Sequence, residues 1–463
     1  MRKIAILSSI LLTLLLTATP LSLALSSTAD NSDFFYQVQS RYVLGTPDGT
    51  NPQGLPLCTS ASVVNLICYS PAFIRSAYNF PAGLDGTGQT ILIVDAFGSP
   101  TIAADLAAFD AHFGLPSPPS FTIFCGNGGC PAFNPRNPHD PIGWAVETSL
   151  DVEYAHAMAP GANIVLVVAA TNSGNALNDA EAAAIAAFPG SIMSQSFGIP
   201  EVFLHANNAQ VLQAHANYAA AAAAGDTVLA SAGDLGATNG FSIANALFPS
   251  SDPLVIAVGG TQGNPFKAPG TLTPCAGTCT IGLAKIIGPC APGSRTTLLG
   301  CSPAGYGGEM VWNEAWLPAA TGGSPSLFFS TPSYQSGLGL STRTTPDISY
   351  NAAVDGGVLV YTTFLGFPHF FIVGGTSAGS PQWAAIFAIV NQARALNSKG
   401  PIGFANPLIY ALTSGQKALG FHDITVGNNQ ELGTPIGFSA GPGWDDASGW
   451  GTPNVANLVT DLS

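Results

Sequence analysis

Continuous apolar runs recur along the chain, separated by stretches in which polar and apolar residues mix. Such a run lacks the strict alternation of a half-buried strand and is typical of a strand buried on both faces in a parallel sheet. We therefore predict buried parallel strands at Thr90–Phe97, Ala162–Ala170, Ser191–Gly198, Thr227–Asp234 and Pro253–Gly260.

Helical patterns lie between and after these runs. They predict helices over Ile102–Phe113, Trp144–Met158, Ala209–Ala224 and Pro381–Leu396. Strands and helices that alternate in this way predict an α/β fold, in which a doubly wound, mostly parallel sheet lies between two layers of helices. Residues 71–463 are expected to form this single large domain.

Two segments do not share the pattern. Residues 27–70 are polar, rich in turn residues and weakly periodic, which indicates a short N-terminal segment before the domain. The stretch Asn264–Gly308 is rich in Gly, Pro and Cys, and we interpret it as a surface insertion.

Residues 1–26 have the layout of a secretory signal peptide. Arg2 and Lys3 precede an apolar run, and small residues follow near Ala24. A membrane anchor is the alternative, but Pro20 interrupts the apolar stretch, which is also short for a membrane span. We expect a secreted, extracellular protein that makes no membrane contact once the leader is removed.

The composition indicates which kinds of partner the protein can bind and the pH of the medium in which it works. Of the 463 residues, 47% are hydrophobic and only 8% charged, and 26 acidic residues outnumber 12 basic ones. This excess of negative charge argues against nucleic acid as a partner. Few charges also suit a protein that must stay folded where carboxylates become protonated, so an acidic medium is expected.

The eight cysteines are an even number and fall into closely spaced pairs. Local disulfides fit a secreted chain. A zinc site is the alternative, although neither a C-x2-C spacing nor a nearby pair of histidines is present. The pairs are Cys58 with Cys68, Cys125 with Cys130, Cys275 with Cys279, and Cys290 with Cys301.

Ser377 is a candidate nucleophile. It lies in a glycine-rich turn between the apolar segment Phe370–Val373 and a hydrophobic helix, and Pro381 suits the first helical turn. A simple helix cap after a glycine turn is the other interpretation. A serine nucleophile usually needs a histidine base, but none of the seven histidines lies in a motif of that kind.

Three carboxyl groups could take part in catalysis in place of a histidine. Glu147 and Asp151 are four residues apart in a predicted helix and share one face, whereas Glu153 does not. Facing the core, they would be stable only as a coupled pair that shares a proton; a solvated acidic face is the alternative. Asp234 ends a predicted strand, where ligands of open α/β sheets bind, but where turn residues are also common.

Together, Glu147, Asp151, Asp234 and Ser377 match the pattern of the sedolisin family, the serine-carboxyl peptidases related in fold to subtilisins. The resemblance covers nearly the whole region from Ser70 to the C-terminus. It implies that Ser377 is the nucleophile, that Glu147 takes its proton, and that Asp151 orients Glu147. Asp234 would stabilise the oxyanion, which requires a protonated acid and thus acidic conditions.

The resemblance also implies one structural calcium ion in a loop at about residues 421–446. Carboxylate and carbonyl oxygens, completed by water, are the ligands that this hard cation prefers. The expected ligands are the carboxylates of Asp423 and Asp445 and the backbone carbonyls of Ile424, Gly441 and Gly443, with Asp446 as an alternative to Asp445.

Other parts of the chain fit the family less directly. Ser194–Gly198 resembles the family's strand beside the substrate cleft, although a core strand is an equal interpretation. Family members commonly carry a large folded pro-domain, whereas only residues 27–70 separate the leader from the peptidase here. Asp95 is assigned a structural role, because no matching histidine accompanies it.

We therefore expect a secreted, acid-active serine-carboxyl endopeptidase that acts on proteins or peptides as a monomer. A catalytically silent binding protein on a peptidase scaffold is one alternative, and a histidine-dependent subtilase is another. The four matching side chains favour the enzyme. The acid pair should then face Ser377, with the serine and Glu147 oxygens at hydrogen-bond distance.

Overall fold

The structure of the chain is a computed structural model. It describes residue 30 and residues 32–47, 57–60, 66–126, 129–263, 306, 308–364, 366 and 369–463. The predicted leader, the Cys275, Cys279, Cys290 and Cys301 side chains and nearly all of the predicted insertion Asn264–Gly308 lie outside these residues.

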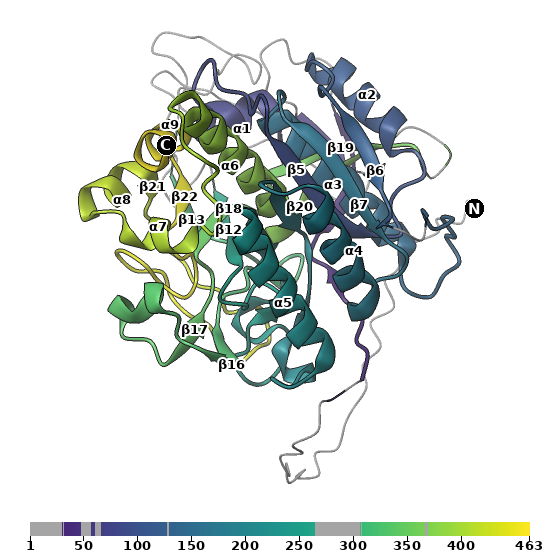
Figure 1. Cartoon of the computed structure of the whole chain (residues 1–463). Coiled ribbons are helices and arrows are strands. Elements are labelled where there is room, and N and C mark those ends of the chain that lie inside the picture. The colour runs from purple at the N-terminus through teal and green to yellow at the C-terminus, as the bar shows by residue number, and fades with distance from the viewer. Residues whose placement is uncertain are drawn as a thin grey trace.

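An eight-stranded sheet forms the centre of the molecule (Figure 1). All its strands run parallel except one at the edge, β13, which is antiparallel to β12. In sheet order the strands are β6 (Phe121–Phe124), β7 (Asn163–Ala169), β5 (Thr90–Ala96), β8 (Ile192–Gln195), β10 (Thr227–Ser231), β12 (Ile256–Gly263) and β13 (Glu309–Val311), and β18 (Ile348–Asn351) also pairs with β12.

Helices cover both faces of this sheet. Along β5, Ile91 and Ile93 belong to one hydrophobic cluster, and Leu92 and Val94 belong to a second on the opposite face. The first cluster includes residues of α1 (Pro71–Ala77), α2 (Ile102–Phe113), α3 (Pro141–Met158), α6 (Gly379–Leu396), α7 (Asn406–Ala411) and α9 (Val455–Leu462); the second includes residues of α4 (Gly174–Ala187) and α5 (Ala209–Ala224). The predicted three-layer α/β fold is confirmed.

Helices α3 and α6 are buried almost all round, as is typical of helices in the core of a large domain. Asp140 caps α3 by accepting a hydrogen bond from the Gly143 amide at 3.0 Å, and Pro141 occupies the first turn. Of the residues in α3, only Ile142 is exposed. A polar side chain on this helix therefore faces protein rather than water.

One predicted strand is divided in two. Ser191–Gly198 forms β8, which ends at Gln195, and β9 (Phe197–Pro200), which leaves the main sheet after Ser196. Strand β9 pairs instead with β1 (Gln37–Val38) and β11 (Leu247–Phe248). The apolar run continues through the break because both strands are buried, so hydrophobicity alone does not reveal it.

A small barrel adjoins the central sheet. It is closed by β19 (Gly357–Thr362), β20 (His369–Gly374), β2 (Arg41–Pro47), β3 (Leu57–Ser60) and β4 (Leu66–Tyr69). Strand β2 runs antiparallel to β20 over Arg41–Gly45. Strands from both sides of the boundary expected near residue 70 thus share one barrel.

The remaining elements are short. They are the strand pairs β14 (Asn313–Glu314) with β15 (Ala319–Ala320), β16 (Pro325–Ser330) with β17 (Thr342–Thr344) and β21 (Phe421–His422) with β22 (Thr452–Pro453), and the helix α8 (Ser414–Gly420). Cys125 and Cys130 form the predicted disulfide, and Cys68 is also disulfide-bonded. In the described part of the chain, no helix is both long and apolar enough to cross a membrane.

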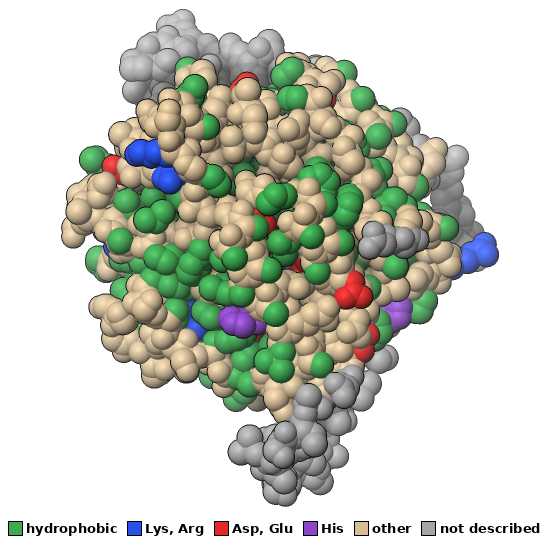
Figure 2. Space-filling model, viewed as in Figure 1, with side chains coloured by type: hydrophobic (Ala, Val, Ile, Leu, Met, Phe, Trp, Pro, Cys, Tyr) green, Lys and Arg blue, Asp and Glu red, His purple; other side chains and the backbone are tan. Residues whose placement is uncertain are grey.

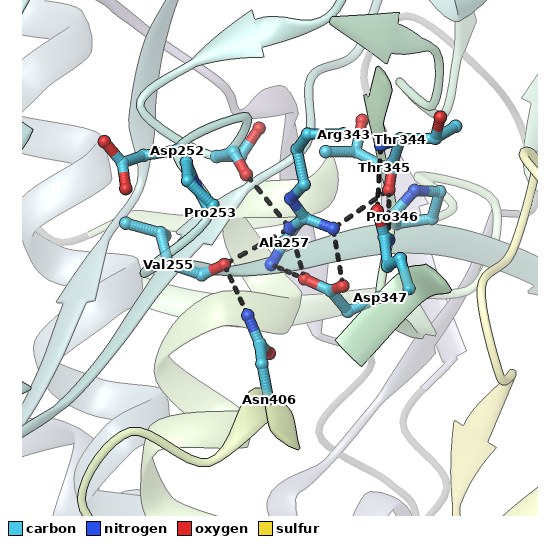
Figure 3. A network of polar contacts seen from close by, with 12 residues as sticks. Asp252, Pro253, Val255, Ala257, Arg343, Thr344, Thr345, Pro346, Asp347 and Asn406 are labelled. Atoms are coloured by element: carbon cyan, nitrogen blue, oxygen red, sulfur yellow. Dashed lines mark hydrogen bonds and ion pairs between the residues drawn. The ribbon is translucent and has the colours of Figure 1, made fainter. Parts of the chain in front are cut away.

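A buried ion pair joins several of these elements (Figure 3). The Arg343 guanidinium donates two hydrogen bonds to the Asp347 carboxylate, at 2.7 and 2.6 Å, and both side chains are fully buried. Asp347 also accepts hydrogen bonds from the Ala257 amide and the Tyr410 hydroxyl. The pair therefore links β17 and the segment that follows it to β12 and α7.

Candidate active site

Helix α3 carries the two acids that were expected to form a pair. Glu147 and Asp151 lie one turn apart and are both fully buried. A solvated acidic face is therefore excluded. Neither carboxyl has a hydrogen-bond partner among the described residues, so ionisation of both carboxyls at once would be unfavourable in this environment.

Burial raises the pKa of Glu147 and of Asp151 well above the ordinary range. For Asp151, the neighbouring charges of Glu147 and Asp95 act in the same direction. The hydroxyls of Ser40 and Ser377 oppose the shift at Glu147. Carboxyls in this arrangement titrate as a group, because ionisation of one disfavours ionisation of the next.

Asp95 is the third member of this carboxyl group. It lies at the carboxyl end of β5, is fully buried, and has a pKa raised to about 7 by burial. In the sequence, the lack of a matching histidine indicates only a structural role for Asp95. Its place at the end of a buried parallel strand was the signal that could have linked it to the site.

Ser377 lies in a single 3-10 turn, Thr376–Ala378, between β20 and α6. Its hydroxyl donates a hydrogen bond to the Ser196 carbonyl at 3.3 Å. The expected short hydrogen bond from Ser377 to Glu147 is not formed, because the Ser377 hydroxyl is directed to Ser196 instead. The serine is nevertheless close enough to Glu147 to lower the pKa of that carboxyl.

Asp234 follows β10 and approaches the serine turn from the other side. One of its oxygens accepts hydrogen bonds from the Thr376 amide and hydroxyl, both at 2.8 Å. Its second oxygen has no hydrogen-bond donor among the described residues, and the Arg41 Nε lies 3.9 Å away. Burial raises the pKa of Asp234 to about 6, although Arg41 and Thr376 oppose the shift.

A glycine is required between Asp234 and the serine turn. Gly375 has a φ of 101°, in the region that side chains disfavour. A Cβ at this position would lie 2.4 Å from the free Asp234 oxygen and 2.5 Å from the Gln39 carbonyl oxygen. Both oxygens therefore pack against the Gly375 backbone, beside the Ser377 amide.

The N-terminal segment supplies further residues that the sequence analysis did not assign to the site. The Gln39 amide donates to the Ser196 carbonyl, and the Gln39 carbonyl accepts from the Ser377 amide, each at 3.2 Å. The next two residues, Ser40 and Arg41, lie near Glu147 and Asp234 respectively. Nothing in the composition of residues 27–70 indicates this placement.

The expected calcium ligands gather in one loop region. The Asp423 carboxylate accepts from the Gly443 amide and the Asp445 carboxylate from the Gly441 amide, both at 2.9 Å. Two carboxylates and nearby carbonyls give an oxygen-rich set that fits a hard cation. Among the described residues, no group of three or more His, Cys, Asp or Glu side chains could hold a metal. Carbonyls would have to supply the other ligands.

No protein-family model matches the chain, but individual proteins do. Kumamolisin from Bacillus sp. (strain MN-32) is 32% identical over 85% of this chain and 63% of its own length. Sedolisin from Pseudomonas sp. (strain 101) is 30% identical over 84% and 60%, and mouse tripeptidyl-peptidase 1 is 29% identical over 68% and 52%. The chain thus spans less than two thirds of the length of these relatives.

A solved structure extends the comparison to the fold. Pseudomonas sedolisin, a serine-carboxyl proteinase complexed with two molecules of pseudo-iodotyrostatin, matches with a TM-score of 0.67 and 25% identity. The match covers 85% of this chain and 98% of that one. The confirmed three-layer fold, the buried acids beside Ser377 and these relatives lead to one conclusion: the chain belongs to the sedolisin family of serine-carboxyl peptidases.

Proposed function

We propose that the chain is an acid-active endopeptidase in which Ser377, Glu147, Asp151 and Asp234 perform catalysis. One observation carries the proposal: three buried carboxyls and one serine converge on the turn before α6. Among the described histidines, none replaces Glu147 beside Ser377; His156, for example, contacts Asp110 and the Pro116 carbonyl. The family's acid chemistry accounts for such a site more simply than an imidazole base.

The reaction follows from these positions. The Ser377 hydroxyl turns from the Ser196 carbonyl, attacks the substrate carbonyl carbon and transfers its proton to Glu147. The Ser377 amide and the protonated Asp234 donate to the oxyanion. Glu147 then protonates the leaving nitrogen, and a water molecule hydrolyses the acyl-enzyme by the same steps. Asp151 orients Glu147 and shares its proton.

An endopeptidase is favoured over a tripeptidyl-peptidase by the length of chain that the site accommodates. The six residues 34–39 lie on the N-terminal side of the point at which a carbonyl meets the Ser377 amide. An enzyme that removes tripeptides needs room for only three residues there. Secretion, a removable leader and a monomeric state remain part of the proposal, on the sequence evidence alone.

A calcium ion would have a structural role. Asp423, Ile424, Gly441, Gly443 and Asp445 would hold it, and the ion would tie together two glycine-rich segments of the loop. Ordering these segments costs conformational entropy, which ion binding offsets. The catalytic steps above do not involve this loop.

Hydrolysis of a denatured protein, measured from pH 2 to pH 8, tests the proposed function. We expect cleavage in acid by the wild-type chain and none by Ser377→Ala, while single substitutions of the seven histidines leave activity in place. A silent scaffold would show no cleavage at any pH. Activity with an optimum at pH 7 to 9 would instead indicate the histidine-dependent mechanism.

A further inference from the structure

Ser196 occupies the break between two strands of the chain. Strand β8 ends at Gln195, which pairs with Val94 of β5 and with Ala230 of β10, and β9 begins at Phe197. Ser196 belongs to neither strand and is fully buried. Its carbonyl and its hydroxyl are therefore both available to groups outside the ladder of the central sheet.

Both groups of Ser196 face the nucleophile. The Ser196 carbonyl accepts from the Ser377 hydroxyl at 3.3 Å, and the Ser196 hydroxyl donates to the Ser377 carbonyl at 3.4 Å. The second distance is long for an O–H donor, so this bond is weak. A serine hydroxyl has one proton and can donate it to only one acceptor at a time. A stronger acceptor within reach would therefore take the hydroxyl away from the Ser377 carbonyl.

Asp151 is such an acceptor. The Ser196 hydroxyl is close enough to Asp151 to lower the pKa of that carboxyl, against the larger upward effect of burial. Neither oxygen of Asp151 has a hydrogen-bond partner among the described residues. An ionised carboxylate binds a hydroxyl more strongly than a neutral backbone carbonyl does. The hydroxyl should therefore turn to Asp151 once the acid pair is ionised.

The charged groups around the acid pair oppose its ionisation. Asp95 on β5 and Asp234 after β10 both raise the pKa of Glu147 by their charge, in addition to the effect of burial. On β2, burial raises the pKa of Tyr42, and the charges of Asp140 and Glu147 act in the same direction. Ionisation of the pair therefore depends on neutral donors, which are hydroxyl groups.

Different hydroxyls serve the two acids. Ser40 and Ser377 lower the pKa of Glu147, whereas Ser196 is the one hydroxyl in the described part of the chain that lowers the pKa of Asp151. Ser377 gives up its proton in the proposed reaction, but Ser196 keeps its own. Ser196 can therefore donate to the acid pair throughout the catalytic cycle.

We propose, resting on the proposed function, that Ser196 is a positioning residue whose hydroxyl turns from the Ser377 carbonyl to Asp151 when the acid pair loses its first proton. The new bond holds one oxygen of Asp151 and leaves the other for the proton shared with Glu147. It also stabilises the singly ionised pair, which is the state that can accept the Ser377 proton. Ser196 thus sets the lower limit of pH at which the pair acts as a base.

The pH profile of kcat/KM on one peptide substrate, measured from pH 2 to pH 8, tests this proposal. Ser196→Ala removes a donor to the ionised pair but leaves the Ser196 carbonyl in place. The pair should then keep both protons to higher pH, so the rise of kcat/KM on the low-pH side should move upward by about one pH unit. The fall on the high-pH side, which reports Asp234, should not move. A purely structural role would lower kcat/KM by the same factor at every pH.

Two further variants complete this comparison. Ser196→Thr keeps a hydroxyl at the position and should restore the wild-type profile. Ser149→Ala is the matched control, because Ser149 is fully buried on the same helix as the acid pair but donates to the Ala145 carbonyl at 3.0 Å. It should move neither side of the profile. If Ser196→Ala does not fold, Ser196→Cys takes its place, because a thiol is a weak donor of similar shape.

Infrared titration of the protonated carboxyl band tests the same contact without turnover. The part of this band that Asp151→Asn abolishes should persist to a higher pH in Ser196→Ala than in Ser149→Ala. An unmoved low-pH side in Ser196→Ala, or an equal shift in Ser149→Ala, would overturn the role of Ser196 and leave the peptidase in place. If the wild-type chain cleaves nothing at any pH, the proposed function fails, and the infrared shift alone decides whether Ser196 donates to Asp151.

Discussion

Residue environment, rather than residue type, distinguishes the acids of the site. Among the described residues, no side chain or amide donates a hydrogen bond to the oxygens of Glu147, Asp151 and Asp95, and burial holds these acids toward the protonated form. Asp234 is equally buried, but Thr376 donates two hydrogen bonds to one of its oxygens. Its second oxygen lies beside Gly375, as does the Gln39 carbonyl oxygen.

The fall of kcat on the high-pH side of the pH profile should report the loss of the Asp234 proton. With a pKa of about 6, Asp234 donates below that pH and loses this ability as pH rises through it, so kcat should fall near pH 6. In Asp234→Asn, the amide keeps both a donor and an acceptor, and cleavage should persist to higher pH. Asp234→Ala should lower kcat at pH 4 by about 10²- to 10³-fold.

Steady-state kinetics from pH 3 to pH 8 on one peptide substrate would measure all three enzymes. Identical upper limbs for wild type and Asp234→Asn would contradict the assignment of this proton.

Glu181, which lies outside the catalytic group, provides a separate test of how burial raises the pKa of a carboxyl and changes the stability of the fold. It lies on α4, is 1% exposed, and its pKa is raised from 4.5 to about 8 by burial. The folded state keeps this proton up to about pH 8, whereas the unfolded chain loses it near 4.5, so stability falls as pH rises between these values. Glu181→Gln should therefore raise stability at pH 7 by on the order of 3 kcal/mol and change little at pH 4.

Urea denaturation at the two pH values would measure this difference. Asp179→Asn is the matched control, because it makes the same carboxyl-to-amide change at an exposed position of the same helix. Equal effects of the two substitutions at pH 7 would contradict a buried, protonated Glu181.

At the scale of elements, the apolar runs predicted the sheet because buried parallel strands have a clear hydrophobic signal. Strands β5, β7, β10 and β12 and helices α2, α3, α5 and α6 lie close to their predicted positions. Strand β12 begins at Ile256 rather than Pro253, because the preceding residues form a turn in which the Leu254 and Val255 amides donate to Asp252. The Ala-rich helix α4 was not predicted.

The part of the site that was missed depends on contacts distant in sequence. Gln39 and Ser40 reach Ser377 and Glu147 because β2 pairs with β20, and no local pattern encodes that pairing. The division of the strand at Ser196 is hidden for the same reason. By contrast, the spacing of Glu147 and Asp151 on one helix is local and could be identified from the sequence.

The Arg343–Asp347 pair tests how strongly neighbouring elements depend on one buried contact. Arg343→Met should destabilise the fold by about 3–5 kcal/mol, because it leaves the Asp347 charge buried without its cation. Arg343→Met combined with Asp347→Asn should recover part of this loss by removing that charge. Chemical denaturation at pH 7 would measure both variants.

Lys399→Met is a suitable control, since this side chain is exposed and hydrogen-bonded only to the terminal Ser463 carbonyl among the described residues. It should change stability by less than about 0.5 kcal/mol. A comparably small effect of Arg343→Met would show that the pair contributes little.

At the scale of the whole molecule, charge is sparse. Figure 2 shows a face on which charged side chains are few and scattered among uncharged ones. Several of the acids are buried with raised pKa values, so the folded chain binds protons that the unfolded chain loses at pH 7, and acidification from pH 7 to pH 4 favours the folded state. Surface and interior therefore both suit an acidic medium.

Calcium should stabilise the whole fold without changing the chemistry. Because the ion would bind only the folded loop, saturating it at a hundred times its Kd should add about 2.7 kcal/mol to stability. A chelator should lower the melting temperature, and Asp423→Ala should remove that response. Asp461→Ala, on α9 and outside the loop, is the control and should retain it.

Scanning calorimetry at pH 6 with calcium or chelator would measure the response. Melting temperatures that do not depend on calcium in the wild-type chain would show that residues 421–446 are only a glycine-rich loop.

The hydrogen-bonded strand at residues 34–39 also has a consequence for ligand design. A synthetic hexapeptide, Phe-Phe-Tyr-Gln-Val-Gln, with an aldehyde in place of its terminal carboxyl group should mimic the bound strand and trap Ser377. Methylation of individual amide nitrogens of the peptide should then show which of them donate hydrogen bonds to the site. The Tyr36 and Gln39 nitrogens donate to protein carbonyls and should not tolerate a methyl group, whereas the Phe35 nitrogen, on the edge that faces away from Ser173, should accept one. The chain thus contains within its own sequence a template for a selective inhibitor.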